Sequence, residues 1–229
     1  MTRGIDAISG LYPLLSEGRQ PLSGPHEVAA FAEAASVLAL AGVRVLQLRL
    51  KASSDGLRLL TQRALQSALA GWDGLLVIDD RADLAAIGAR ERAPHGPRIG
   101  LHLGQTDLPP AAARAIVGPD VVIGLSTHDL AQVVAAAGEP VDYLGFGPVF
   151  PTRTKIDPDP VVGLGGLAEA VRASVRPVVA IGGIGLSALP ELRRAGAAAA
   201  AVVSLLWPDG MVGSEGLAKR VGDAMEAFR

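Results

Sequence analysis

The sequence contains no cysteine, few aromatic residues and almost no excess of either charge. Without cysteine the chain has no disulfide framework, no thiolate zinc site and no cysteine nucleophile, which fits a cytosolic enzyme. Aromatic residues make up only 3% of the chain, so we expect an aliphatic core and no stacking surface for nucleic-acid bases. The 21 basic and 23 acidic residues give a net charge of −2, which argues against a polybasic nucleic-acid binder.

Long apolar runs and a secretory leader are also missing. The most apolar stretch, residues 195–207, is too short to cross a bilayer. The first residues lack the charged and then apolar pattern of a signal peptide. With 49% hydrophobic residues in 229, the chain can bury a large core and is not intrinsically disordered. We therefore expect a cytoplasmic globular protein with no membrane partner.

Short apolar runs rich in β-branched residues alternate with Ala- and Leu-rich stretches of helical spacing. The runs predicted as strands are 11–15, 43–48, 75–78, 99–103, 121–125, 143–146, 177–181 and 199–205. The predicted helices are 27–41, 55–70, 82–87, 110–117, 129–137, 165–174, 186–195 and 215–228. Such alternation predicts a parallel sheet covered on both faces. Eight units in this length predict an α/β protein, a single (β/α)8 barrel domain over residues 1–229, rather than an open doubly wound sheet.

Polar residues follow these strands, where a barrel builds its active site from the loops between strands and helices. Gln47, Arg49 and Lys51 alternate along one strand and so point to the same side. An arginine and a lysine on one side suit a multiply charged anion. An ordinary solvated strand end with two cations fits the same pattern.

Carboxylates follow the next two strands. Asp79 and Asp80 end one strand, and Asp107 comes shortly after the next. Carboxylates on neighbouring strand ends can share Mg²⁺, which also binds phosphate oxygens. Asp80 and Asp107 each also fit the N-cap of a following helix. Together with the two cations, they favour binding of a metal–diphosphate complex.

A glycine- and proline-rich loop over residues 145–155 ends in hydroxyls and cations, among them Thr152, Thr154 and Lys155. Its backbone amides and hydroxyls could wrap an anion, with Lys155 balancing the charge. A surface loop without function is the alternative.

The last two predicted strands end in a pattern typical of phosphate sites. Gly182 and Gly183 follow the seventh strand, and Val203 and Ser204 lie in the eighth run. The loops after strands seven and eight usually bind phosphate in such barrels, where glycines let backbone amides approach the anion. The glycines could equally serve only a tight turn.

The four histidines do not have the spacing of a metal cluster. His128 follows Ser126 at a strand end and could act in catalysis, or lie solvated before the next helix. Ser126 is not in a GxSxG elbow, so a Ser-His-Asp hydrolase is disfavoured. His102 alternates with its strand and could orient Asp107 or a core neighbour.

In order and spacing, these motifs resemble the thiamine-phosphate synthase family from about residue 11 to 206. The segments that carry the resemblance are 47–51 (QLRLK), 79–84 (DDRADL), 100–107 (GLHLGQTD), 124–128 (GLSTH), 142–143 (DY), 145–155 (GFGPVFPTRTK) and 180–184 (AIGGI). The resemblance implies a (β/α)8 transferase of thiamine biosynthesis. It would join hydroxymethylpyrimidine diphosphate to thiazole phosphate, giving thiamine phosphate and diphosphate.

The resemblance also implies a role for each motif residue. Gln47 would contact the pyrimidine; Arg49, Lys51, Ser126 and Lys155 would hold the diphosphate; Asp80 and Asp107 would bind Mg²⁺; Thr152, Thr154, Gly182, Val203 and Ser204 would hold the thiazole phosphate. Asp79 lies among the substrate-binding positions where the family usually has Asn. The extra carboxylate could repel diphosphate or join the metal shell.

Two other functions fit the same span. The related thiazole tautomerases resemble this chain and use a histidine at the position of His128, but tend to lack the full diphosphate set. A barrel that binds thiamine precursors without turnover is the second alternative. The sequence leaves the oligomeric state open, with a homo-oligomer among the alternatives.

Overall fold

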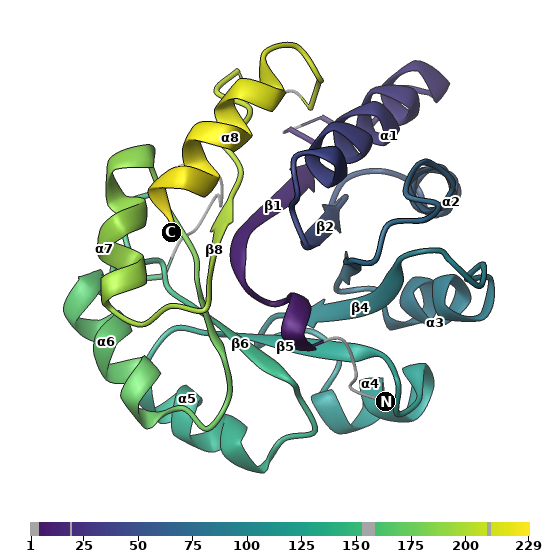
Figure 1. The fold of residues 1–229 in the computed structure, drawn as a ribbon. Coiled ribbons are helices and arrows are strands. Elements are labelled where there is room, and N and C mark those ends of the chain that lie inside the picture. The colour runs from purple at the N-terminus through teal and green to yellow at the C-terminus, as the bar shows by residue number, and fades with distance from the viewer. Residues whose placement is uncertain (1–4, 19, 153–158, 210–211) are drawn as a thin grey trace.

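Eight parallel strands form a closed barrel in the computed structural model, which describes residues 5–18, 20–152, 159–209 and 212–229 (Figure 1). The strands are β1 (Gly10–Ser16), β2 (Val45–Arg49), β3 (Leu75–Asp79), β4 (Arg98–Leu103), β5 (Val122–Thr127), β6 (Tyr143–Phe146), β7 (Val178–Ala180) and β8 (Ala199–Val202). Each strand pairs with the next, and β1 pairs with β8 to close the barrel. The (β/α)8 prediction is confirmed.

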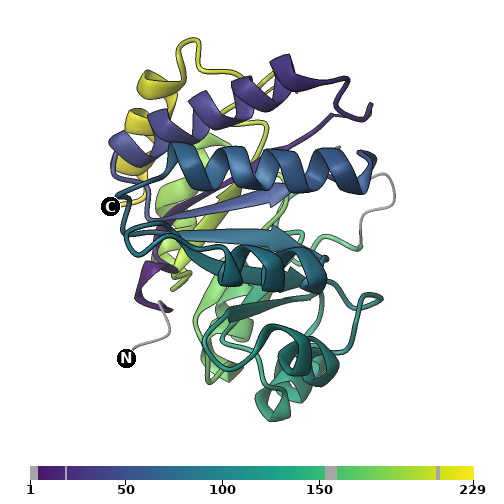
Figure 2. The same cartoon turned by 90° about the vertical axis from the view of Figure 1, so that its right-hand side faces the viewer.

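Helices follow the strands and surround the barrel (Figures 1 and 2). They are α1 (Pro25–Leu40), α2 (Asp55–Ala68), α3 (Ala82–Arg90), α4 (Pro110–Val117), α5 (Leu130–Ala135), α6 (Gly163–Ala173), α7 (Leu189–Arg194) and α8 (Leu217–Ala227). Short 3-10 turns η1 (Ile5–Ala7), η2 (Ala136–Gly138) and η3 (Leu186–Ala188) accompany them. Within the described ranges, no helix is long and apolar enough to cross a membrane.

The apolar core has two layers. The larger lies between strands and helices and is built mainly of Leu, Val and Ala, as the lack of aromatic residues predicts. The smaller fills the barrel and contains both tyrosines, Tyr12 and Tyr143. Gly124 gives the Tyr143 ring its space, because a Cβ at that position would lie 2.1 Å from the ring. The interior is therefore packed at the end where the strands begin, and the site lies at the other end.

Several predicted boundaries differ from the structure by one or more residues, and two of these differences have a clear local cause. The eighth strand ends at Val202 rather than at residue 205, because the Val203 carbonyl accepts bonds from the amides of Leu206 and Trp207 and turns the chain. The last helix begins at Leu217 after Gly216, which has a left-handed φ of 62°. Ser214, whose position suggested an N-cap, instead donates to Glu33 at 2.7 Å.

Candidate active site

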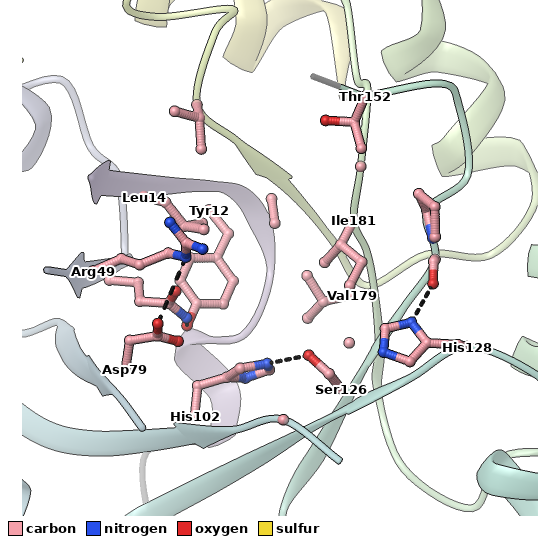
Figure 3. Close-up of a pocket in the computed structure, with 18 of the residues that line it drawn as sticks. Tyr12, Leu14, Arg49, Asp79, His102, Ser126, His128, Thr152, Val179 and Ile181 are labelled. Carbon is pink, nitrogen blue, oxygen red and sulfur yellow. Dashed lines mark hydrogen bonds and ion pairs between the residues drawn. The ribbon is translucent and has the colours of Figure 1, made fainter. Parts of the chain in front are cut away.

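A pocket of about 450 Å³ opens where the strands end, the end at which the sequence predicts an active site (Figure 3). Every predicted site residue that the structure describes lines it. These are Gln47, Arg49, Lys51, Asp79, Asp80, Asp107, Ser126, Thr152, Gly182, Val203 and Ser204, together with His128. Thr154 and Lys155 lie outside the described residues. Side chains from strand ends far apart in sequence thus meet in one cavity.

The alternation along β2 brings Gln47, Arg49 and Lys51 to the pocket wall. Asp79, at the end of the neighbouring β3, lies 3.6 Å from Arg49 Nε and 3.1 Å from Lys51 Nζ through its Oδ2 atom. Its side chain is only 8% exposed, whereas that of Lys51 is 46% exposed. A buried anion therefore holds two cations that still reach the cavity.

The charge of Lys51 is reinforced by its surroundings. Burial alone would lower the pKa of Lys51, but the carboxylates of Asp79 and Asp80 outweigh it and raise that pKa. Lys51 Nζ contacts Asp80 directly. The ammonium group therefore stays charged, as binding of a diphosphate requires.

Asp80 and Asp107 form the acidic edge of the pocket. Asp80 has a left-handed φ of 59°, and its amide donates to the His102 carbonyl at 2.8 Å. Burial and the nearby charge of Asp79 raise the pKa of Asp80 to about 6, and a hydrogen bond with Asp107 adds to the shift. Asp107 is fixed by the Gly104 amide at 2.7 Å. Neither carboxylate caps a helix, because the residues before α3 and α4 are Arg81 and Pro109.

These two carboxylates fit a magnesium ion. They supply hard oxygen ligands, and the two side chains lie within hydrogen-bond reach of each other. Among the described residues, no group of three His, Cys, Asp or Glu side chains could hold a metal ion. A pair of carboxylates, completed by water and substrate phosphate, is how proteins usually bind Mg²⁺.

The opposite wall is built from closely packed loops after β6 and β7. The Val149 amide donates to the Ile181 carbonyl at 2.8 Å, and the Phe150 amide to the Gly182 carbonyl at 3.1 Å. Gly182 has a φ of 90°, and a Cβ there would lie 2.5 Å from the Cβ of Pro148. Only glycine fits this contact. The loops thus bring Gly182 and Thr152 to the wall that faces the cations.

Polar side chains inside the barrel were not predicted as functional. Tyr12, His102 and Tyr143 are buried, line the floor of the pocket and are hydrogen-bonded to one another or to site residues. Burial lowers the pKa of His102 below 6.5, so the ring is neutral at pH 7. The sequence signal was a polar residue at an interior position of an apolar strand. That pattern did not say which residues the side chains meet.

His128 also lines the pocket. Its Nδ1 atom lies 2.6 Å from the Gly147 carbonyl oxygen, an atom that can only accept, so Nδ1 carries hydrogen (Figure 3). Asp129, not His128, caps α5 by accepting from the Gln132 amide at 2.8 Å. In the neutral ring Nε2 is therefore the acceptor atom.

The fold and these walls define a class of protein, a (β/α)8 barrel with a pocket of cationic and acidic side chains at the ends of its strands. The family model described as "Thiamine monophosphate synthase" matches residues 20–206. The chain belongs to this family.

Curated relatives carry the same name. The chain is 42% identical over 188 residues to the thiamine-phosphate synthase of Anaeromyxobacter dehalogenans, covering 82% of this chain and 80% of the relative. The synthase of Myxococcus xanthus is 37% identical over 85% of this chain and 83% of its own length. The Synechococcus sp. (strain CC9311) synthase is 41% identical over 73% of this chain, which spans only 45% of that longer protein.

Among solved structures, thiamine phosphate pyrophosphorylase from Pyrococcus furiosus superposes with a TM-score of 0.77 at 27% identity, covering 98% of this chain and 97% of that one. The resemblance seen in the sequence motifs is confirmed at the level of family and fold.

Proposed function

We propose that the protein is a Mg²⁺-dependent thiamine-phosphate synthase, which joins 4-amino-2-methyl-5-hydroxymethylpyrimidine diphosphate to thiazole phosphate. The observation that carries the proposal is one pocket edge with two cations, Arg49 and Lys51, beside two carboxylates, Asp80 and Asp107. Family membership supports the same reaction. A diphosphate needs the cations, and a magnesium–diphosphate complex needs both sets.

Bond breaking starts at the carbon that carries the diphosphate. The C–O bond breaks, its electron pair leaves with diphosphate, and the electron-rich aminopyrimidine stabilises the cation left behind. Arg49 and Lys51 hold the departing negative charge, and Ser126 can add a hydrogen bond. Gln47 lies on the same wall and presents amide atoms to the pyrimidine edge.

Bond making needs no nucleophile from the protein. The thiazole nitrogen attacks the methylene carbon and gives thiamine phosphate. Thr152 and Ser204, with the backbone at Gly182 and Val203, would hold the thiazole phosphate on the facing wall. Thr154 and Lys155, by family resemblance, would add to this set. The barrel then acts mainly by placing two substrates against each other.

Mg²⁺, held by Asp80 and Asp107, would supply neutralisation of the diphosphate charge. Through its ion pairs, Asp79 would hold Arg49 and Lys51 in position before the substrate binds.

The deciding experiment mixes purified protein with both substrates and Mg²⁺ and follows thiamine phosphate, with EDTA as the control. We expect product that EDTA abolishes. Arg49→Gln should lower kcat/KM by about 100-fold, whereas Arg63→Gln, which removes an exposed cation paired with Glu91, should not. No product from intact substrates would overturn the proposal.

One observation favours a second candidate in that event. His128 holds its ring with an acceptor nitrogen available at the pocket, a suitable base for a thiazole tautomerase. Proton exchange on a thiazole carboxylate, lost in His128→Asn, would then replace the synthase reaction as the conclusion.

A further inference from the structure

A continuous chain of buried hydrogen bonds crosses the barrel beneath the pocket. Gln47 Nε2 lies 3.1 Å from Tyr12 Oη, and Tyr12 Oη lies 2.9 Å from Tyr143 Oη. Tyr143 Oη is 2.9 Å from His102 Nδ1, and His102 Nε2 is 2.9 Å from Ser126 Oγ. Its two ends, Gln47 and Ser126, line the pocket, and the reaction proposed above gives its three central members no role.

Counting hydrogens gives the chain a direction. The Gln47 amide nitrogen can only donate, so Tyr12 accepts and its own hydrogen goes to Tyr143. Tyr143 then donates to His102 Nδ1. The neutral ring carries its hydrogen on Nε2 and donates it to Ser126 (Figure 3). Ser126 Oγ has accepted, so its own hydrogen is left for a ligand.

The reverse direction leaves a buried group unsatisfied. If His102 donated to Tyr143 and Tyr143 to Tyr12, then Tyr12 would accept two bonds, one of them from Gln47. The hydrogen of the Tyr12 hydroxyl would then have no acceptor, because among the described residues this hydroxyl has hydrogen bonds only with Gln47 and Tyr143. Tyr12 is 1% exposed, so water does not replace that acceptor.

We propose that Tyr12, Tyr143 and His102 are positioning residues that fix His102 as the Nε2–H tautomer and thereby make the Ser126 hydroxyl a hydrogen-bond donor toward the bound diphosphate. The diphosphate part rests on the proposed function. A serine hydroxyl alone can donate or accept, and the acidic edge of the pocket offers competing acceptors. Phosphate oxygens only accept, so an oriented donor favours the anion. The tautomer is set by successive hydrogen bonds that begin at Gln47 on β2 and end at Ser126 on β5.

The first experiment reads the tautomer in the unaltered protein. Protein with ¹⁵N-labelled histidine contains only four such residues, and the His102 signals are assigned by their loss in His102→Gln. We expect a bare Nδ1 and a protonated Nε2 at neutral pH. In Tyr143→Phe, which removes the donor to Nδ1, the two signals should move toward a mixture of tautomers. A wild-type Nδ1–H tautomer, or unchanged signals in Tyr143→Phe, would overturn the proposal.

The second experiment measures binding of inorganic diphosphate with Mg²⁺ by calorimetry in wild type, Ser126→Ala, Tyr143→Phe and the double variant. Each single change should weaken binding about tenfold. Because Tyr143 acts only through Ser126, the double variant should bind no worse than Ser126→Ala. If the double variant binds more weakly than Ser126→Ala by the factor that Tyr143→Phe causes alone, the proposed action of Tyr143 through Ser126 is overturned. Tyr12→Phe is the second variant, in case Tyr143→Phe does not fold, and should weaken binding less because Tyr143 can still donate to His102.

The two failures are distinguishable. If wild-type protein binds no magnesium diphosphate, the proposed function fails and the tautomer result still stands or falls by itself. If the wild type binds and the losses of affinity in the two single variants multiply in the double variant, the proposed role of the hydrogen-bond chain fails. The proposed function is then unaffected.

Discussion

Asp79 sets the charge balance of the pocket, because its buried carboxylate pairs with the two cations that a diphosphate would need. Asp79→Asn keeps the shape and removes the competing charge. We expect the affinity for magnesium diphosphate to stay the same or to rise by up to about tenfold. A tenfold change corresponds to the free energy of a shift of about one pKa unit caused by a nearby charge. Calorimetric titration measures it.

Asp83→Asn is the matched control, since Asp83 is exposed, pairs with Arg81 and lies outside the pocket lining. A tenfold or larger loss of affinity in Asp79→Asn alone would mean that the carboxylate orients the cations more than it competes for them.

His102 gives stability a pH dependence of defined sign. Burial lowers its pKa in the folded protein below 6.5, so the unfolded chain binds the proton more readily. The stabilising effect is complete above pH 6.5 and is lost as pH falls toward the lowered pKa. Urea unfolding between pH 5 and 7.5 should therefore show a rise of stability with pH that is smaller in His102→Gln. Equal slopes in both proteins would contradict the buried neutral ring.

At the scale of elements, the loop that joins β2 to α2 is held from outside the pocket. The buried carboxylate of Glu17 accepts from the Ser53 amide at 3.2 Å and also contacts the Ala52 amide and the Ser53 hydroxyl. Arg58 donates to the Lys51 carbonyl at 2.8 Å. The position of Lys51 therefore depends on β1 and α2 as well as on β2.

Glu17→Gln replaces one of these acceptor oxygens by a donor that faces Ser53. We expect a loss of about 1–3 kcal/mol in the free energy of unfolding and weaker binding of magnesium diphosphate, measured by urea unfolding and calorimetry. Glu169→Gln, at an exposed position on α6, is the control and should change neither. Unchanged binding in Glu17→Gln would show that Lys51 is held without this clamp.

The sequence predicted an element accurately where a single local pattern determines its ends. The strand at 143–146 and the helix at 110–117 match the structure residue for residue. The end of β8 was missed because Val203 reads as a strand residue, whereas a turn formed by the amides of Leu206 and Trp207 ends the strand. The cap predicted at Ser214 was missed because its hydroxyl donates to Glu33 in α1, a contact that depends on the tertiary fold.

The site was predicted as a set because residues after parallel strands meet at one edge, whatever their distance in sequence. The Asp79 ion pairs and the relay through Tyr12 and Tyr143 were not, because they depend on which strands are neighbours and on interior packing. Tyr12 and Tyr143 are 131 residues apart, and only barrel closure brings them together.

At the scale of the molecule, a cluster of polar contacts stabilises the end of the barrel that lies away from the pocket. Before β5 and β6, opposite the pocket, Arg114 donates to Asp142 at 2.8 Å and to the carbonyls of Val121 and Pro140. Its side chain is 16% exposed and that of Asp142 12%. This cluster ties α4 to the starts of two strands.

Arg114→Leu removes the partly buried ion pair with Asp142 and the hydrogen bonds to the two carbonyls. We expect a loss of about 3 kcal/mol in the free energy of unfolding, measured by urea unfolding, with KM for both substrates unchanged at temperatures where the variant is folded. Arg193→Leu, at an exposed position on α7, serves as control. A changed KM in Arg114→Leu would show that the two ends are coupled.

Closure by β1 and β8 also has a consequence for synthesis on the ribosome. Gly10 pairs with Ala199 and Pro13 with Val202, so β1 cannot complete its pairing until β8 has been synthesised. Until then β1 presents a bare edge to other nascent chains, and the wall that carries Ser204 does not exist. Until β8 has been made, the pocket is incomplete and no bound ligand can stabilise the growing barrel, so the open edge of β1 stays exposed in that interval.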